Sequence, residues 1–227
     1  MRAVTRRLRR LRYAGLLPIL AIAATAAPVQ ADCGGVVASY PRGWHHDYRP
    51  PLVIGDSTMT FAVPYIARRG MQANARGCRQ WGEGMDILRR RKSAGSLPHL
   101  VVMALGANWV VTRGDIEAAV RLLGPKRVLG IVVPREEGGG TSSDAYNVRR
   151  AGRRHRNRVK VLDWPRYSSR HGAWFSGDGL HMSYNGAAAF AKLVATLKPF
   201  APWPKPKPKL APQPAPEPAP PPPPPGG

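Results

Sequence analysis

Four polar residues of this chain have the types and spacing that ester chemistry requires: Ser57, Asn108, Asp178 and His181. A serine hydroxyl is a weak nucleophile until a histidine accepts its proton, and a carboxylate commonly orients that histidine. Asp178 and His181 are three residues apart, so a helical turn would place both side chains on one face. The sequence therefore predicts that one short segment delivers a base and its orienting carboxylate to Ser57.

The same chemistry needs hydrogen-bond donors for the negative charge that develops on the acyl oxygen. The backbone N–H of Ser57 at a helix start is one candidate, and the side-chain amide of Asn108 is another. One such donor typically contributes ~3 kcal/mol in the transition state. Taken singly, Gly-Asp-Ser and Asp-Gly are common turn or cap sequences, and a lone histidine is more often structural. Their order and their position after apolar runs favour one active site.

Short apolar runs alternate with longer amphipathic stretches, which is typical of an α/β protein. Strands are predicted over 51–55, 71–75, 99–105, 127–133 and 158–162. Helices are predicted over 58–69, 84–94, 115–123, 144–155 and 183–197, with Pro64 either kinking the first or marking its start. This pattern predicts a three-layer α/β/α sandwich around a five-stranded parallel sheet. Ligands of such sheets bind at the carboxyl ends of the strands, so the glycine-rich loop 136–143 is also expected to border the site.

The two ends of the chain differ from this core. Residues 1–31 combine six arginines, an apolar run and the small-residue end Val29-Gln30-Ala31. This pattern predicts a secretory signal peptide cleaved near Ala31. A retained membrane anchor is the alternative, although the apolar run is shorter than the ~20 residues that span a bilayer. Residues 202–227 are almost entirely Pro, Ala and Lys and predict an extended, disordered tail. Residues 32–201 suffice for one domain.

The formal net charge of the chain is +22. Outside the cell, such a charge favours contact with an anionic cell-wall polymer. Nucleic acid is the other usual partner of basic proteins, but the arginines are spread over several segments and no nucleic-acid motif occurs, so none is expected. An arginine-rich composition of the whole genome would also explain most of this charge.

Cysteine and histidine usage points to one disulfide and no metal. Cys33 and Cys78 are the two cysteines, and in an oxidising compartment they are expected to pair. A reactive thiol is the alternative, but neither cysteine has an obvious histidine partner. His45, His46 and Asp47 could hold a metal, yet a surface loop is the better interpretation because no further spaced ligands follow. No metal or cofactor is expected.

Together the three motifs resemble those of the SGNH (GDSL-type) hydrolase superfamily. Gly55-Asp56-Ser57 is similar to its first block, Gly106-Ala107-Asn108 to the G-x-N of its third, and Asp178-Gly179-Leu180-His181 to the D-x-x-H of its last. The resemblance covers about residues 50–199. It implies a flavodoxin-like SGNH hydrolase fold, a catalytic triad of Ser57, Asp178 and His181, and Asn108 in the oxyanion hole.

The resemblance also implies a glycine N–H in the oxyanion hole, for which Gly77 is the candidate and Cys78 the alternative. Trp109 departs from the family pattern, because an aspartate often follows the G-x-N asparagine. The segment 77–80, the pair Asp163-Trp164 and the segment 174–181 are similar to the extracellular SGNH domains of bacterial peptidoglycan O-acetyltransferases. In that family these domains normally follow a multi-span membrane acyltransferase that supplies acetyl groups.

The sequence thus predicts an exported, monomeric serine esterase that hydrolyses O-acyl esters on a cell-envelope carbohydrate. It would be secreted or associated with the cell wall. If a sugar hydroxyl replaced water, the same residues would make an O-acyltransferase. A non-catalytic wall-binding protein is the alternative from another class, suggested by the basic charge, the proline-rich end and Trp109.

Overall fold

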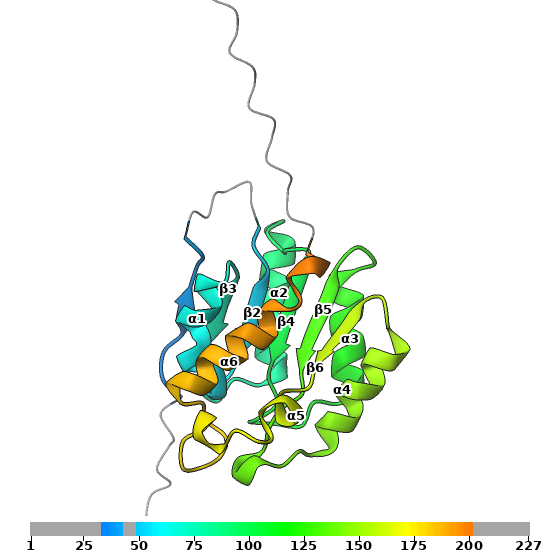
Figure 1. The fold of residues 1–227 in the computed structure, drawn as a ribbon. Helices are drawn as coiled ribbons and strands as arrows, with labels where there is room; N and C mark the ends of the chain where they lie inside the picture. Colours follow the sequence, from blue (N-terminus) through cyan, green and yellow to red (C-terminus); the bar gives the residue numbers. More distant parts are fainter. Residues whose placement is uncertain (1–32, 43–48, 202–227) are drawn as a thin grey trace, which may run out of the picture. The chain divides into compact units, whose positions relative to one another are not determined.

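A twisted sheet with helices on both of its faces organises the chain (Figure 1). The structure, a computed structural model, describes residues 33–42 and 49–201. The predicted signal peptide, the proline-rich end and the segment His45-His46-Asp47 lie outside the described residues.

Five parallel strands form the sheet as predicted, and one further strand joins its edge. The strand order is β1-β3-β2-β4-β5-β6, and β1 runs antiparallel to β3. The strands are β1 (Val37–Ser39), β2 (Leu52–Gly55), β3 (Gln72–Ala75), β4 (Leu100–Ala104), β5 (Val128–Val132) and β6 (Val159–Leu162). The sequence analysis missed β1 because this strand has three residues, none of them fully buried, and so shows no apolar run.

The strands of the sheet centre are buried on both faces, as their continuous apolar runs predict. Leu52 and Ile54 of β2 pack with α2 (Trp81–Ser93), α3 (Arg113–Leu123) and α4 (Ser143–Arg154). Val53 packs on the other face, with α1 (Val63–Arg68), α5 (Trp164–Ser168) and α6 (Tyr184–Ala195). The described chain therefore has the predicted three layers.

The predicted helix over 58–69 is two elements. A 3-10 helix, η1 (Ser57–Ala62), precedes α1, and Pro64 lies in the first turn of α1, where its missing N–H costs no hydrogen bond. The side chain of Asp56 caps η1 by accepting the N–H of Thr58 at 3.1 Å. Ser57 is thus the first residue of a helix that starts directly after β2.

Other helix boundaries also differ from the prediction. Helix α2 begins at Trp81 rather than at residue 84, because Gln80 and Glu83 form a capping box that the prediction overlooked. Helix α5 was not predicted. It has five residues, and Asp163 caps it by accepting the N–H of Arg166 at 3.2 Å.

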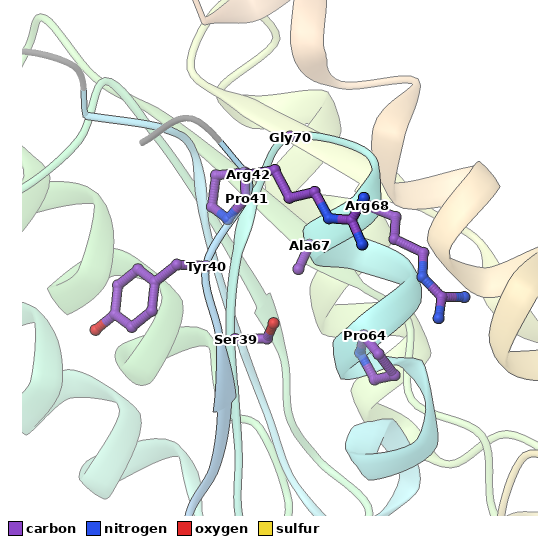
Figure 2. A pocket seen from close by; sticks show the side chains of 8 residues that line it. All are labelled: Ser39, Tyr40, Pro41, Arg42, Pro64, Ala67, Arg68 and Gly70. Carbon is purple, nitrogen blue, oxygen red and sulfur yellow. The ribbon is translucent and has the colours of Figure 1, made fainter. Parts of the chain in front are cut away.

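A hollow of about 430 Å³ lies between the end of β1 and α1 (Figure 2). Ser39 pairs with Ala73 near the start of β3, so this hollow is at the amino ends of the parallel strands. Its lining contains Arg42 and Arg68 and no residue of the predicted triad. The hollow is therefore separate from the strand edge that carries the candidate site.

Candidate active site

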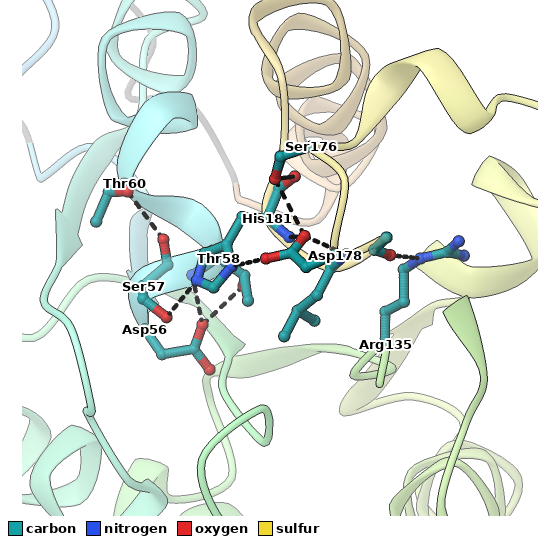
Figure 3. Close-up of polar contacts among 10 residues, drawn as sticks. Asp56, Ser57, Thr58, Thr60, Arg135, Ser176, Asp178 and His181 are labelled. Atoms are coloured by element: carbon teal, nitrogen blue, oxygen red, sulfur yellow. Dashed lines mark hydrogen bonds and ion pairs between the residues drawn. The ribbon is translucent and has the colours of Figure 1, made fainter. Parts of the chain in front are cut away.

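The structure brings Ser57, His181 and Asp178 into one chain of hydrogen bonds (Figure 3). The Nε2 atom of His181 lies 3.0 Å from the Oγ of Ser57, and its Nδ1 atom lies 2.6 Å from Oδ2 of Asp178. Because a carboxylate can only accept, Nδ1 carries the proton and Nε2 is free to accept the hydroxyl of Ser57. This is the arrangement in which imidazole can withdraw the serine proton.

The spacing of Asp178 and His181 had suggested a helical turn, but neither residue lies on a helix. They belong to a turn before α6, in which Gly179 has a φ of +67°. The Oδ1 atom of Asp178 accepts the N–H groups of Leu180 at 2.9 Å and His181 at 3.0 Å. The carboxylate therefore closes the turn that presents its own histidine, and the left-handed glycine stops a helix from forming.

The hydrogen bond to His181, followed by the N–H of Leu180, holds the pKa of the Asp178 carboxyl well below its usual range. The hydroxyl of Ser176 adds a further contact, 3.0 Å from Oδ1. Asp178 is therefore ionised whenever His181 could act as a base.

Arg135, which the sequence analysis did not single out, anchors this turn to the end of β5. Its Nε donates to the carbonyl of Gly179 at 2.6 Å, and its guanidinium lies 4.0 Å from the ring centre of Phe175. Burial lowers the pKa of Arg135. The glycine-rich loop contributes as well, because the N–H of Gly138 donates to the carbonyl of Asp178 at 2.9 Å. That loop borders the site, as predicted.

Asp56 connects the nucleophile segment to the loop that carries Asn108. It is buried, and its Oδ1 accepts the Thr58 hydroxyl at 2.7 Å while its Oδ2 accepts the N–H of Ala107 at 3.3 Å. Burial raises the pKa of this carboxyl. The Gly-Asp-Ser triplet thus supplies a positioning residue as well as the serine.

Of the two other predicted oxyanion donors, Gly77 lies in the turn between β3 and α2, and Asn108 contacts that turn. The Nδ2 atom of Asn108 donates to the carbonyl of Arg79 at 3.4 Å, which leaves its second N–H for another acceptor. Gly77 packs against the backbone of Cys33, where an added Cβ would lie 2.3 Å from the Cys33 oxygen. That close approach is a structural reason for a glycine at this position. Cys78 lies in the same turn, and its φ of +53° is in the left-handed region.

The predicted disulfide is present and joins Cys33 to Cys78, with their Cα atoms 5.2 Å apart. It fastens the segment before β1 to the turn that holds Gly77. The reactive-thiol alternative is wrong, since both sulfurs are paired.

Arg79 is a buried arginine at this edge of the sheet, and the sequence pointed to it only as part of the segment 77–80. Its Nη1 donates to the carbonyl of Gly55 at 2.9 Å and to that of Asn74 at 2.8 Å. Its Nη2 donates to Oδ1 of Asn74 at 2.8 Å. One guanidinium therefore fixes the ends of β2 and β3, immediately before Asp56 and Ser57. A single arginine in the sequence carried no signal for this role.

A small cavity lies beside the residues that flank Ser57, but neither Ser57 nor His181 lines it. Asp56, Thr58, Ala107 and Leu180 contribute to its lining, together with apolar residues of β4, β5 and α6. Its volume is about 20 Å³, which is room for about one water.

Among the described residues, no three or more His, Cys, Asp or Glu side chains gather as a metal site would require. Within the same residues, no helix combines the length and apolar character needed to cross a bilayer.

Comparison with known proteins identifies the fold of this chain. No protein-family model matches the chain. The chain is 22% identical to the C-terminal catalytic domain of Streptococcus pneumoniae peptidoglycan O-acetyltransferase A (OatA), with a TM-score of 0.59. The match covers 68% of this chain and 96% of that domain. The chain has the SGNH hydrolase fold.

Two curated proteins are also similar in sequence to this SGNH-fold chain. O-acetyltransferase OatA of Staphylococcus aureus is 26% identical over 149 residues, which are 63% of this chain and 24% of OatA. The putative peptidoglycan O-acetyltransferase YrhL of Bacillus subtilis is 24% identical over 147 residues, which are 63% of this chain and 23% of YrhL. The chain thus spans about a quarter of the length of these relatives.

Proposed function

We propose that this SGNH-fold chain is a serine-dependent enzyme that handles O-acyl groups on a cell-wall glycan. The observation that supports this most directly is the hydrogen-bonded chain from Ser57 through His181 to Asp178. The relatives' names supply the substrate class, because two of them are called peptidoglycan O-acetyltransferases.

In the first step, the Oγ of Ser57 attacks the acyl carbon while His181 Nε2 takes the hydroxyl proton. The negative charge on the acyl oxygen is held by the N–H of Ser57, with Asn108 and Gly77 as further candidate donors. The bond to the leaving alcohol then breaks, and the alcohol takes the proton from His181. The acyl group is now bound to Ser57.

In the second step, an acceptor hydroxyl loses its proton to His181 and attacks the acyl-Ser57 carbon. Ser57 regains a proton as its bond to the acyl group breaks. If water is the acceptor, the reaction is hydrolysis, and if a sugar hydroxyl is the acceptor, the reaction is transfer. The names of the relatives favour the sugar. The side chain of His181 is 41% exposed, so water also has access.

The acyl group is expected to be short. The relatives are named O-acetyltransferases, and acetyl is a short acyl group. We predict that kcat/KM for chromogenic esters falls steadily from acetyl to butyryl to octanoyl. An octanoyl ester that is processed faster than the acetyl ester would contradict this proposal.

The central test compares the full chain with Ser57→Ala on a chromogenic acetyl ester. Loss of the nucleophile is expected to lower kcat by at least about 10³-fold. Ser93→Ala, an exposed serine on α2, is the matched control and is expected to keep full activity. If wild type is as inactive as Ser57→Ala across several acyl lengths, a non-catalytic wall-binding role becomes the better explanation.

A second measurement distinguishes transfer from hydrolysis. The chain is given the acetyl ester together with a soluble glycan oligosaccharide, and mass spectrometry follows acetylated oligosaccharide and free acetate. Acetylated product that depends on Ser57 supports transfer. Free acetate alone, at an unchanged rate when the glycan is added, supports hydrolysis.

A further inference from the structure

Three aromatic side chains near the candidate active site are largely open to solvent. The exposed fractions are 50% for Phe61, 70% for Trp109 and 69% for Tyr184. Each closely follows a candidate site residue, because Phe61 is in η1 after Ser57, Trp109 follows Asn108, and Tyr184 follows His181 and opens α6. We call Phe61, Trp109 and Tyr184 the aromatic rim.

Phe61 and Tyr184 contact each other across the two segments that carry the nucleophile and the base. Their ring centres are 5.4 Å apart, and their planes meet at 64°, an edge-to-face arrangement. The same two segments are joined by the 3.0 Å hydrogen bond between Ser57 Oγ and His181 Nε2, so the ring pair forms a second contact between them.

Packing within the chain covers only part of the aromatic rim, because Phe61 and Tyr184 remain half or more exposed although they contact each other. A single exposed apolar side chain is ordinary in a folded protein, but several at one functional edge indicate a contact surface. Trp109 is the most exposed member.

We propose that the aromatic rim is a binding surface for the sugar rings of the glycan, so this inference rests on the proposed function. A pyranose ring presents C–H groups on its faces, and the negative face of an aromatic ring attracts them, while the sugar hydroxyls at the ring edge stay in water. An acyl chain is a poorer fit for the aromatic rim, because the relatives are named O-acetyltransferases and an acetyl group is too small to cover these rings. The rim would therefore hold the alcohol side of the substrate.

The test measures binding and turnover separately, using Trp109→Ala and the double variant Phe61→Ala/Tyr184→Ala. Binding of a β-1,4-linked N-acetylglucosamine tetrasaccharide is measured by calorimetry in a Ser57→Ala background. Turnover is measured as kcat/KM for an O-acetylated form of that tetrasaccharide and for a small chromogenic acetyl ester. Because aromatic contacts contribute roughly 0.5–1.5 kcal/mol each, the binding constant is expected to weaken about tenfold in the double variant. The ratio of glycan to small-ester kcat/KM is expected to fall similarly.

Tyr40→Ala is the matched control. Tyr40 is 54% exposed, and its side chain points away from α1 at the far end of the sheet (Figure 2). This variant is expected to bind and turn over both substrates like wild type. Thermal unfolding of every variant checks that the fold is retained.

The experiments can contradict the rim proposal and leave the proposed function intact. They can also contradict the proposed function and leave the rim proposal intact. If Ser57-dependent ester turnover is present but the rim variants bind the tetrasaccharide like wild type, the rim proposal is wrong. It is equally wrong if the rim variants lose small-ester and glycan turnover in the same proportion, or if an octyl chain binds the rim in place of the sugar. If rim-dependent sugar binding occurs without any ester turnover, the proposed function fails and the rim stands.

Discussion

Asp178 uses both of its carboxylate oxygens in the turn before α6, one for the imidazole and one for the backbone. We predict that Asp178→Asn lowers kcat about 10⁴-fold, because an amide at this position favours the wrong imidazole tautomer. Initial rates on the acetyl ester measure this. A loss of less than about tenfold would show that His181 is oriented by other groups.

The lowered pKa of Asp178 also predicts how stability depends on pH. A carboxyl whose folded pKa lies below its unfolded value of 3.8 contributes stability that is complete above the unfolded value and is lost as pH falls toward the folded one. The difference in unfolding free energy between wild type and Asp178→Asn should therefore be constant from pH 7 to about pH 5 and shrink below pH 4. Denaturant titrations at pH 3 and 7 measure this difference. A difference that grows on acidification would contradict the prediction.

Arg79 is buried, although no pattern in the sequence around it predicts a buried arginine. Arg79→Met would remove the guanidinium from the carbonyls of Gly55 and Asn74, and the Gly55 carbonyl would keep only the N–H of Arg76 at 3.3 Å. We predict a loss of about 2–4 kcal/mol in unfolding free energy. Arg89→Met on α2, which removes an exposed ion pair with Asp86, is the control and should cost less than about 1 kcal/mol. Equal effects of the two substitutions would show that Arg79 does not hold the strand ends.

At the scale of elements, the position of His181 depends on the close packing of the first turn of α6 against η3 (Gly172–Trp174). An added Cβ on Gly186 would lie 1.9 Å from the carbonyl oxygen of Trp174. We predict that Gly186→Ala costs roughly 1–3 kcal/mol in stability and lowers activity, since His181 directly precedes α6. Gly82→Ala on the exposed face of α2, where no atom lies within 4 Å of the new Cβ, should instead stabilise the protein slightly. Thermal unfolding and ester turnover are the measurements, and an undisturbed Gly186→Ala protein would contradict the prediction.

The disulfide joins two elements that the hydrophobic core holds only weakly, the segment before β1 and the turn after β3. Its cysteines are 45 residues apart. In the chain-entropy account, a cross-link that closes a loop of this length lowers the entropy of the unfolded chain and so stabilises the folded state by about 4 kcal/mol. We predict that Cys33→Ser/Cys78→Ser loses roughly 2–4 kcal/mol of unfolding free energy. Wild type under reducing conditions is the matched control and should behave like the double variant. An unchanged unfolding midpoint in both would contradict this role.

At the scale of the whole molecule, the net charge of +22 predicts salt-dependent binding to an anionic polymer. Basic side chains concentrate around a hollow of about 600 Å³ between α4, β6 and the end of α6, which Arg149, Arg153, Arg156 and Lys160 help to line. Polyphosphate is a suitable probe, and its affinity should fall steeply between 50 and 300 mM NaCl because exposed charges are screened (Debye length about 10 Å at 0.1 M).

Charge-reversal variants test whether polyphosphate binds at this hollow. Arg153→Glu/Arg156→Glu should weaken polyphosphate binding more than Arg113→Glu/Arg121→Glu, the matched pair on α3. Equal weakening by both pairs would show that only the total charge matters. The absence of binding at low salt would contradict an electrostatic contact with such polymers altogether.

Local pattern was sufficient for the layers of this protein and for Ser57, Asp178 and His181, which hydrogen-bond at the candidate site. The oxyanion roles of Asn108 and Gly77 stay predictions. Apolar runs and helical spacing depend on neighbours in sequence, so the five parallel strands and most helices could be predicted. The parallel arrangement then required segments around Ser57, Asn108 and Asp178 to reach the same edge of the sheet. The strand β1 could not be predicted, because it is short, partly exposed and held by pairing with β3 rather than by its own pattern.

The sequence by itself determined the fold class, the pairing of Cys33 with Cys78, and which side chains could perform acyl chemistry. Only the tertiary structure decided how those side chains are held: by the turn that Asp178 closes, by Arg79 across the strand ends, and by Arg135 against Phe175. It also decided that the exposed rings of Phe61 and Tyr184 contact each other and so join the segments that carry the nucleophile and the base. The physical reason is the sequence separation of the contacts. Periodicity depends on neighbours within one element, whereas most of these contacts join residues that are far apart in the sequence and meet only when the elements pack.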